Sequence, residues 1–230
     1  MTTMRRHKAD SSYPRGEETR ARIIRTAIAL FGEKGFSGVT TREIAARAEV
    51  PAPSLQYYFD NKEGLYAACM EDIQAEASRA VAPALARLEE LLAQEADIDR
   101  LIDAYCAVQE SLADFLFAIP DADSRALFIA RQRLPTRPAL AKPDPKNSPG
   151  KRIHERCIAV IRRIAGDDIA PEEIRLIATT IGGQLLIVHL MREHIGDLLG
   201  WKDITPAQVG ELKRVVRRQT TAILNSYRRE

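Results

Sequence analysis

The stretch from Thr40 to Leu65, TTREIAARAEVPAPSLQYYFDNKEGL, predicts two short helices joined by a tight turn. Thr40 and Glu43 have the spacing of a capping box, in which the Thr hydroxyl accepts from a backbone N–H and the Glu carboxylate reaches back to the cap. Pro51 ends the first helix, because proline is tolerated only in a turn or in a first helical turn. The second helix then covers about residues 52–58.

The apolar residues of this stretch recur at helical spacing, so each predicted helix has one buried face. The inward residues are Ile44, Ala45 and Ala48 in the first helix and Leu55 and Phe59 in the second. The sequence DNKE at 60–63 opens a third helix with an Asx cap and an acidic first turn, which suits the orphan amides and the helix dipole. The pattern is typical of a helix-turn-helix.

The side chains left outside are hydroxyls, an amide and cations, the groups that contact phosphates and base edges of DNA. A helical hairpin inside an ordinary all-α core is the generic alternative. The outward residues are Thr40, Thr41, Arg42, Gln56, Tyr57, Tyr58 and Lys62. Their chemistry favours a DNA-binding surface.

One more helix precedes the pair, from Glu17 to Lys34. Its apolar residues Ile24, Ala27, Ile28 and Phe31 form a single stripe, and Gly35 then ends the helix, since glycine enters the left-handed conformation at low cost. We expect a compact three-helix unit. Residues 1–16 are basic and aperiodic, and predict a flexible tail or, alternatively, an arm that follows the DNA.

From Thr19 to about Tyr66 the chain resembles the amino-terminal domain of the tetracycline-repressor (TetR) family of bacterial transcriptional regulators. TRARIIRTAIALFGEKGF, TTREIAARA and the run L-x-Y-x-F-x-N-K-E-x-L from Leu55 to Leu65 carry the resemblance. KEGLYAAC, the ALFIAR segment and the Leu-Gly-Trp at 199–201 are most similar to the CecR-like branch of the family.

The resemblance implies roles for individual residues on the DNA. The phosphates would be held by Thr40, Thr41, Tyr57 and Lys62, and the major groove would face Arg42, Ala52, Ser54 and Gln56. Pro51 stands where the family usually has a Ser or Thr helix cap, and Pro53 where Gly, Ala or a polar residue is frequent. These departures bear on which DNA sequence is read.

Composition allows a sizeable core and two domains in 230 residues, of which 45% are hydrophobic and 29% charged. Residues 1–62 hold 11 Lys or Arg and 7 Asp or Glu, a net +4, whereas the remainder is at −2. A basic end is a modest electrostatic footprint for nucleic acid. We expect the tail at 1–16, the helix-turn-helix domain at 17–66 and a helical effector-binding and dimerisation domain at 67–230.

Cysteine usage and the absence of targeting signals predict a soluble, cytoplasmic protein. Cys69, Cys106 and Cys157 are odd in number and far apart, which argues against a disulfide framework or a zinc finger and favours buried thiols. The amino terminus lacks the apolar run of a signal peptide, and we expect no window long enough to span a membrane.

The rest of the chain predicts further helices separated by caps and breakers. Pro83 interrupts the segment 62–94 and indicates a junction between two helices, with Pro83 in the first turn of the second. Helices follow at about 97–118 and 123–134. The stretch 135–149 holds five of the twelve prolines and predicts an extended loop, either a lid or a plain connection.

The carboxy-terminal helices predict the dimer surface. The segment from Pro171 to about Leu199 is apolar almost all round, so we expect one helix buried on nearly every side. Gly182 and Gly183 within it predict the close approach of another helix. A last helix begins at Thr205. The final two long helices of each subunit would form a four-helix bundle in a two-fold homodimer, which suits an operator of inverted half-sites.

Catalytic motifs are missing from the sequence. It contains no H-E-x-x-H, no G-x-S-x-G and no P-loop, so we expect no enzyme, no cofactor and no metal. His189 and Glu193 share i, i+4 spacing, but no third metal ligand accompanies them.

Polar residues interrupt the apolar faces of the carboxy-terminal helices, as the walls of a small-molecule pocket require. They serve either an effector site or internal hydrogen bonds and the dimer interface. The candidate effector residues are Tyr105, Gln109, Phe128, Arg131, Gln184 and His189. The sequence as a whole predicts an all-α, homodimeric DNA-binding transcriptional regulator, a repressor released by a small ligand. The alternatives are a small-molecule-binding protein or enzyme with an incidental helix-turn-helix, and a non-specific DNA binder.

Overall fold

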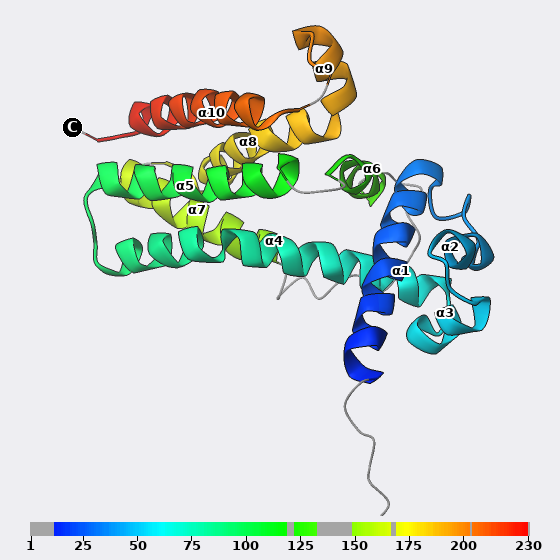
Figure 1. Ribbon diagram of the computed structural model, residues 1–230. Coiled ribbons are helices and arrows are strands. Elements are labelled where there is room, and N and C mark those ends of the chain that lie inside the picture. Colours follow the sequence, from blue (N-terminus) through cyan, green and yellow to red (C-terminus); the bar gives the residue numbers. More distant parts are fainter. Residues whose placement is uncertain (1–11, 119–121, 133–148, 167–168, 203, 230) are drawn as a thin grey trace, which may run out of the picture.

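The computed structural model describes residues 12–118, 122–132, 149–166, 169–202 and 204–229, which form ten helices and no strands. The all-α prediction is confirmed. Helices α1 to α3 gather at one end of the molecule, and α4 leads from them into a bundle with α5, α7, α8 and α10 (Figure 1). The predicted loop lies outside the described residues except for Pro149, which opens α7.

The three-helix end consists of α1 (Ser12–Lys34), α2 (Thr41–Arg47) and α3 (Ala52–Phe59). The apolar stripe of α1 packs with Ile44 and Leu55 into one buried core. Helix α1 begins at Ser12, so the predicted start at Glu17 is five residues late. Pro14 lies in the first turn, where no helical hydrogen bond is lost, and therefore does not delay the helix.

Helix α4 (Lys62–Ala93) is continuous through Pro83, so the predicted junction between two helices is wrong. Proline removes the hydrogen bond to the carbonyl of residue 79, but Pro83 is on the exposed face, where water can satisfy that carbonyl. On the opposite face Val81 and Leu85 are buried. Their packing keeps the helix in one piece.

The bundle places α5 (Ile98–Phe117) beside α4, and α7 (Pro149–Ala165), α8 (Pro171–Leu190) and α10 (Pro206–Ser226) against them (Figure 1). Asp97 caps α5 by accepting from the Arg100 amide at 3.0 Å. Gly166 follows α7 in the left-handed conformation. All three cysteines are buried and free, which confirms the prediction of structural thiols.

Helix α6 (Ala122–Gln132) is short and lies between α1 and the bundle (Figure 1). Gly32 of α1 makes the contact close, because a Cβ there would lie 2.7 Å from the Ser124 carbonyl oxygen. Phe128 is fully buried against the rings of Phe31 and Tyr66. The three-helix end and the bundle are therefore packed together through α6.

The long carboxy-terminal helix predicted at 171–199 is two helices, α8 and α9 (Arg192–Leu199), with a break at Met191. Within one subunit the segment is not buried on nearly every side, because Leu176 and Ile187 are exposed. A Cβ added at Gly182 or Gly183 would meet no described atom within 4 Å, so the predicted close approach does not occur within the subunit.

By length and composition alone, α8 is apolar enough to cross a membrane, contrary to the sequence prediction. Its inward side, which includes Ile177, Ile181 and Leu185, is buried in the bundle, as in the core helix of a globular protein. The apolar residues on its outward side give α8 its high hydropathy.

Candidate functional site

The helix-turn-helix is held by the predicted cap at Thr40, whose hydroxyl accepts from the Glu43 amide at 3.1 Å. Only this half of the predicted capping box is made, because the Glu43 carboxylate lies against Lys34 at the end of α1. The hydrogen bond from Lys34 lowers the pKa of Glu43 below its ordinary value. The ion pair ties α2 to α1 and leaves the hydroxyl as the cap.

The turn between α2 and α3 has a feature that sequence reasoning missed. Glu49 has φ of 54°, in the left-handed region that favours glycine. Pro51 caps α3 without any side-chain hydrogen bond, as predicted, and the Ser54 amide instead donates to the Pro51 carbonyl at 2.9 Å. The outer surface of α3 starts with exposed Pro51, Ala52 and Pro53, whose side chains offer no hydrogen-bonding group.

Four of the predicted DNA-contacting residues surround one hollow of about 490 Å³ beside the turn: Thr40, Thr41, Gln56 and Lys62. Asn61 also lines it, and its side chain caps α4 by accepting from the Gly64 amide at 2.7 Å. The Lys62 ammonium lies 4.4 Å from the centre of the Phe36 ring, which positions the cation at the rim.

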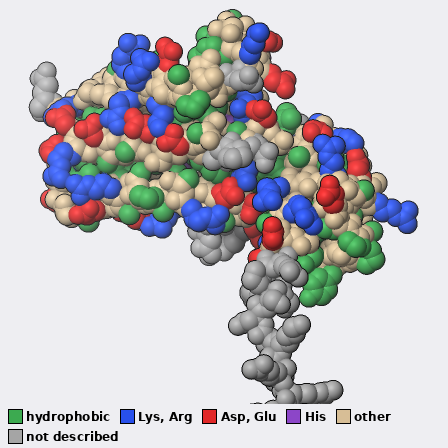
Figure 2. All heavy atoms as spheres, in the orientation of Figure 1, with side chains coloured by type: hydrophobic (Ala, Val, Ile, Leu, Met, Phe, Trp, Pro, Cys, Tyr) green, Lys and Arg blue, Asp and Glu red, His purple; other side chains and the backbone are tan. Residues whose placement is uncertain are grey.

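The remaining predicted contacts lie around this hollow. Arg42 and Ala52 are exposed and Ser54 is half-buried. The Tyr57 side chain is 83% exposed, while Tyr58 is half-buried and packs edge-on against the Tyr57 ring at 5.1 Å. Figure 2 shows hydrophobic side chains gathered at the α3 end of the molecule, with Lys and Arg side chains nearby. An exposed tyrosine beside hydroxyls and a cation is suited to a phosphate backbone.

The structure does not bring the six candidate effector residues together. Tyr105 and Gln109 are buried on α5, and the Gln109 amide nitrogen donates to the Ile181 carbonyl at 3.4 Å. Phe128 packs toward α1. Arg131 donates to the carbonyls of residues 32 and 33 at 2.6 and 2.8 Å, so it caps the end of α1.

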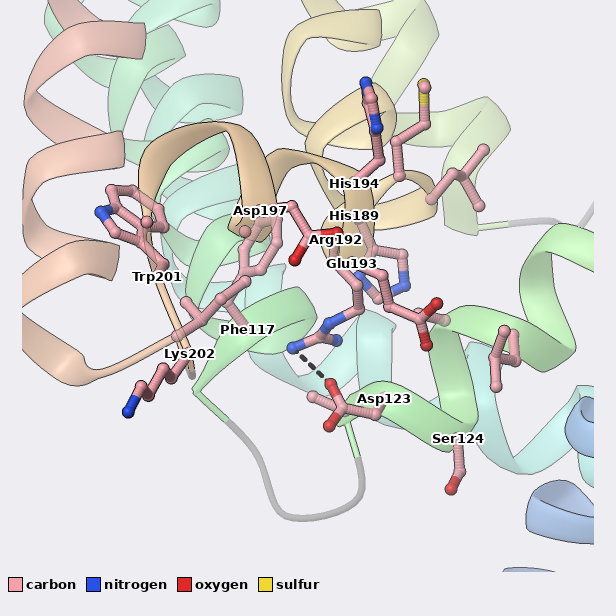
Figure 3. A pocket seen from close by; sticks show the side chains of 18 residues that line it. Phe117, Asp123, Ser124, His189, Arg192, Glu193, His194, Asp197, Trp201 and Lys202 are labelled. Carbon is pink, nitrogen blue, oxygen red and sulfur yellow. Dashed lines mark ion pairs between the residues drawn. The ribbon is translucent and has the colours of Figure 1, made fainter.

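A cleft of about 1040 Å³ opens between α5, α6, α8, α9 and the segment that leads to α10. Of the six candidates, His189 is the one that lines it; Gln184, half-buried on α8, does not. Arg192 extends from the start of α9 to Asp123 at the start of α6, with 2.7 Å between nitrogen and oxygen (Figure 3). Phe117 and Trp201 add aromatic rings to the wall.

His189 is 1% exposed, and its ring lies edge-on to Phe117 at 5.6 Å. Burial, with the nearby positive charge of Arg192, lowers the pKa of His189 to about 4, although the Leu116 carbonyl opposes this shift. The imidazole is therefore neutral at physiological pH. Because the break at Met191 separates α8 from α9, Glu193 is exposed and does not share a helix with His189, so the metal pair considered from the sequence is not formed.

Helix α6 links the cleft to the three-helix end, a role that sequence reasoning missed. Its first turn lines the cleft through Asp123, and its last turn caps α1 through Arg131. Between them, buried Arg125 forms an ion pair with Glu76 of α4. The spacing of Arg125 and Arg131 along α6 is the sequence signal for this linking role. The residues that these two arginines contact are 49 and 99 positions away in sequence, so local spacing does not identify them.

Comparison with known proteins agrees with this geometry. Residues 23–69 match the family model for bacterial regulatory proteins of the TetR family, and residues 101–227 match the C-terminal domain of the HTH-type transcriptional dual regulator CecR. CecR of Shigella flexneri is 31% identical over 192 residues, which cover 81% of this chain and 82% of that protein.

Two further comparisons differ in how much of the chain they cover. A negative transcriptional regulator of a biofilm operon, IcaR of Staphylococcus epidermidis, is 41% identical over 51 residues, 22% of this chain and 28% of that protein. A crystal structure of a transcriptional regulator from Rhodococcus sp. Rha1 shares the fold, with a TM-score of 0.54 and 22% identity over 90% of this chain and 96% of that one. The chain is therefore a DNA-binding transcriptional regulator that belongs to the TetR family and, within it, to the CecR-like branch.

Proposed function

We propose that this regulator is a repressor that binds an inverted-repeat operator as a homodimer and leaves it when a small molecule occupies the cleft. The observation that carries the proposal is α6, because its first turn lines the cleft and its last turn caps α1. A ligand that contacts the start of α6 can thus act on the helix that supports the helix-turn-helix.

The DNA contacts divide into positioning and reading. Thr40, Thr41, Tyr57 and Lys62 offer hydroxyls and a cation to phosphates, with Tyr58 supporting Tyr57 by ring contact. The major groove is read by Arg42 and Gln56 through hydrogen bonds and by Ala52 and Ser54 at close range. Exposed Pro51 and Pro53 at the start of α3 add apolar contacts to the reading of the bases.

The homodimer is supported by the outward face of α8. Leu176 is 59% exposed and Ile187 50%, and between them this face carries only Gly182, Gly183 and the small side chains of Thr179 and Thr180. A second copy that lays its own α8 and α10 on this face would bury these side chains in a four-helix bundle. Its two-fold axis would place two recognition helices on half-sites about 34–36 Å apart, or a multiple of that distance.

Release requires that the ligand bind one spacing of the recognition helices better than the other. Asp123 and Ser124 of α6 lie in the cleft, and Ser124 also contacts Gly32 of α1. A ligand-induced shift at this turn would reach the three-helix end directly.

We propose that the protein acts in the cytoplasm and catalyses no reaction.

The test is a selection of genomic DNA fragments by the purified protein at physiological salt, followed by sequencing. We expect enrichment of a short inverted repeat next to promoters, and two subunits per repeat in sedimentation of the complex. A flat fragment profile with steep salt dependence would replace the proposal with non-specific DNA binding. Transcription from the enriched promoter, measured with and without the protein, distinguishes a repressor from an activator.

A further inference from the structure

The cleft between α5, α6, α8 and α9 contains buried nitrogen atoms without partners. The Leu116 carbonyl is near the His189 ring, but neither ring nitrogen makes a hydrogen bond of good geometry with a described residue, and neither does Nη1 of Arg192. Buried polar groups in folded proteins are nearly always paired, because an unpaired one loses its hydrogen bonds to water without replacement. Nη1 of Arg192 and the single N–H of the neutral His189 ring are both donors, so they mark a place where a ligand supplies the missing acceptor.

Asp123, which forms an ion pair with Arg192, compensates only weakly for the burial of the guanidinium. The Arg192 side chain is 13% exposed, whereas the Asp123 side chain is 81% exposed. The ion pair joins the Asp123 carboxylate to Nη2 of the guanidinium. A solvated carboxylate in a surface ion pair contributes little. A guanidinium has five donors and prefers bidentate contact with an anion, so Arg192 has donors to spare within the cleft.

The other charged groups of the cleft do not fill this position. Glu193 and Asp197 on α9 are exposed, as are His194 and Lys202. Figure 3 shows Lys202 directed away from Arg192, and Asp123 as the residue joined to it. A cationic ligand would meet its acidic partners only at the solvated rim, while the buried nitrogens favour an acceptor.

We propose that the cleft binds a small amphiphile with a carboxylate head, held by Arg192 Nη1 and by the ring N–H of His189. The inference rests on the proposed function, whose effector class it names. The apolar body of the ligand would lie against Phe117, Met191 and Trp201, which line the same cleft. Neutral His189 donates through one nitrogen, so the single negative charge is balanced by Arg192.

The ligand carboxylate competes with Asp123 for the guanidinium. Binding therefore loosens the contact between the start of α6 and the start of α9. The competition predicts effects of opposite sign for two variants: Arg192→Gln removes the anion site, whereas Asp123→Asn removes the competitor and strengthens anion binding.

Trp201, the only tryptophan of the chain, reports on the cleft by its fluorescence. The probes are 4-phenylbutyrate, 4-phenylbutyramide and 4-phenylbutylamine, which share an apolar body and differ in head charge. Each is titrated into the full-length wild type, Arg192→Gln, Arg192→Lys, Asp123→Asn and, as a control for general electrostatics, Lys202→Gln. Thermal unfolding and operator binding of each variant without probe show whether it folds.

We expect the wild type to bind the carboxylate at least tenfold more tightly than the amide or the amine. Arg192→Gln should lose that preference, Arg192→Lys should keep part of it, Asp123→Asn should increase the carboxylate affinity several-fold and Lys202→Gln should change it less than twofold. Equal affinities, a preference for the amine, or no carboxylate binding at millimolar concentration would each overturn the carboxylate site. Operator binding is measured without probe, so its failure would instead count against the proposed repressor.

Discussion

At the residue scale, unpaired backbone groups and charges at the helix ends determine which role a polar side chain takes. Arg131 looks like a pocket residue in the sequence, but the last carbonyls of α1 have no helical partner, and a cation there also suits the helix dipole. Glu43 likewise forms an ion pair with Lys34 rather than the predicted hydrogen bond of the capping box. His189 keeps a neutral ring because burial disfavours its charged form.

Substitutions on the predicted DNA surface should separate positioning from reading. Tyr57→Ala and Lys62→Ala remove a phosphate contact and should weaken binding to all sequences, with Lys62→Ala also reducing the salt slope by about one. Gln56→Ala should change which base is preferred at one position. Binding to a panel of operator variants at several salt concentrations measures both effects. An equal loss of specificity in all three variants would contradict this division of roles.

His189 predicts a pH dependence of stability. As the pH falls through 6.5 the unfolded chain takes up a proton on this residue, whereas the folded chain does so only near its lowered pKa of about 4. Stability contributed by the neutral ring is therefore lost as the pH falls below 6.5, by about 2 kcal/mol between pH 7 and pH 5. Chemical denaturation of wild type and His189→Gln at both values checks it. The variant should lack this part of the loss, and identical losses in the two proteins would refute the assignment.

At the scale of elements, helices are continuous or broken according to which face is packed. Pro83 is on the exposed side of α4 and leaves the helix intact, whereas α8 ends at Leu190, where the chain turns to form α9 and one wall of the cleft. Helix α6 is held on two sides, by Arg125 to α4 and by Arg131 to α1. It is short, but it carries the contact between the cleft and the three-helix end.

The packing of α1 on α6 should not tolerate a methyl group at Gly32. A Cβ would lie 2.7 Å from the Ser124 carbonyl oxygen and 3.2 Å from the Phe128 amide nitrogen, both backbone atoms. Gly32→Ala should cost about 1–3 kcal/mol of stability through overpacking. Gly210→Ala is the matched control: it is on helix α10, where an added Cβ meets no described atom within 4 Å. It should be neutral or stabilising by up to about 1 kcal/mol in the same urea titration.

A neutral result for Gly32→Ala would mean that α6 can move away from α1 freely. The proposed transmission of the ligand signal through this contact would then fail. If the contact is tight, Gly32→Ala should also change the ligand concentration needed to release the operator, while Gly210→Ala should not.

At the scale of the molecule, one face is left without a partner. The outward side of α8 exposes Leu176 and Ile187 around two glycines, and the described part of the subunit covers none of this face. Ion pairs from α10 to α5, such as Arg217 with Glu110, fasten α10 to the bundle beside α8. We propose that a second copy of the chain covers this face.

Ile187→Arg should convert the proposed dimer into monomers, because it places a charge on the exposed face of α8. Ala86→Arg, on the exposed side of α4, is the control and should leave the assembly unchanged. Sedimentation velocity measures the mass, and operator binding should fall at least tenfold for Ile187→Arg because one half-site is engaged at a time. A dimer that persists in Ile187→Arg would exclude this face.

The sequence alone determined the all-α class and the helix-turn-helix, with its cap at Thr40 and an Asx cap for the helix that follows. These features depend on apolar spacing and on hydrogen bonds between residues a few positions apart, so they are visible in the sequence itself. Only the tertiary structure decided that Arg131 is a cap, that α8 has an open face, and that His189 and Arg192 share a cleft with Asp123. Those relations join residues tens of positions apart, and their geometry follows from how whole helices pack rather than from local spacing.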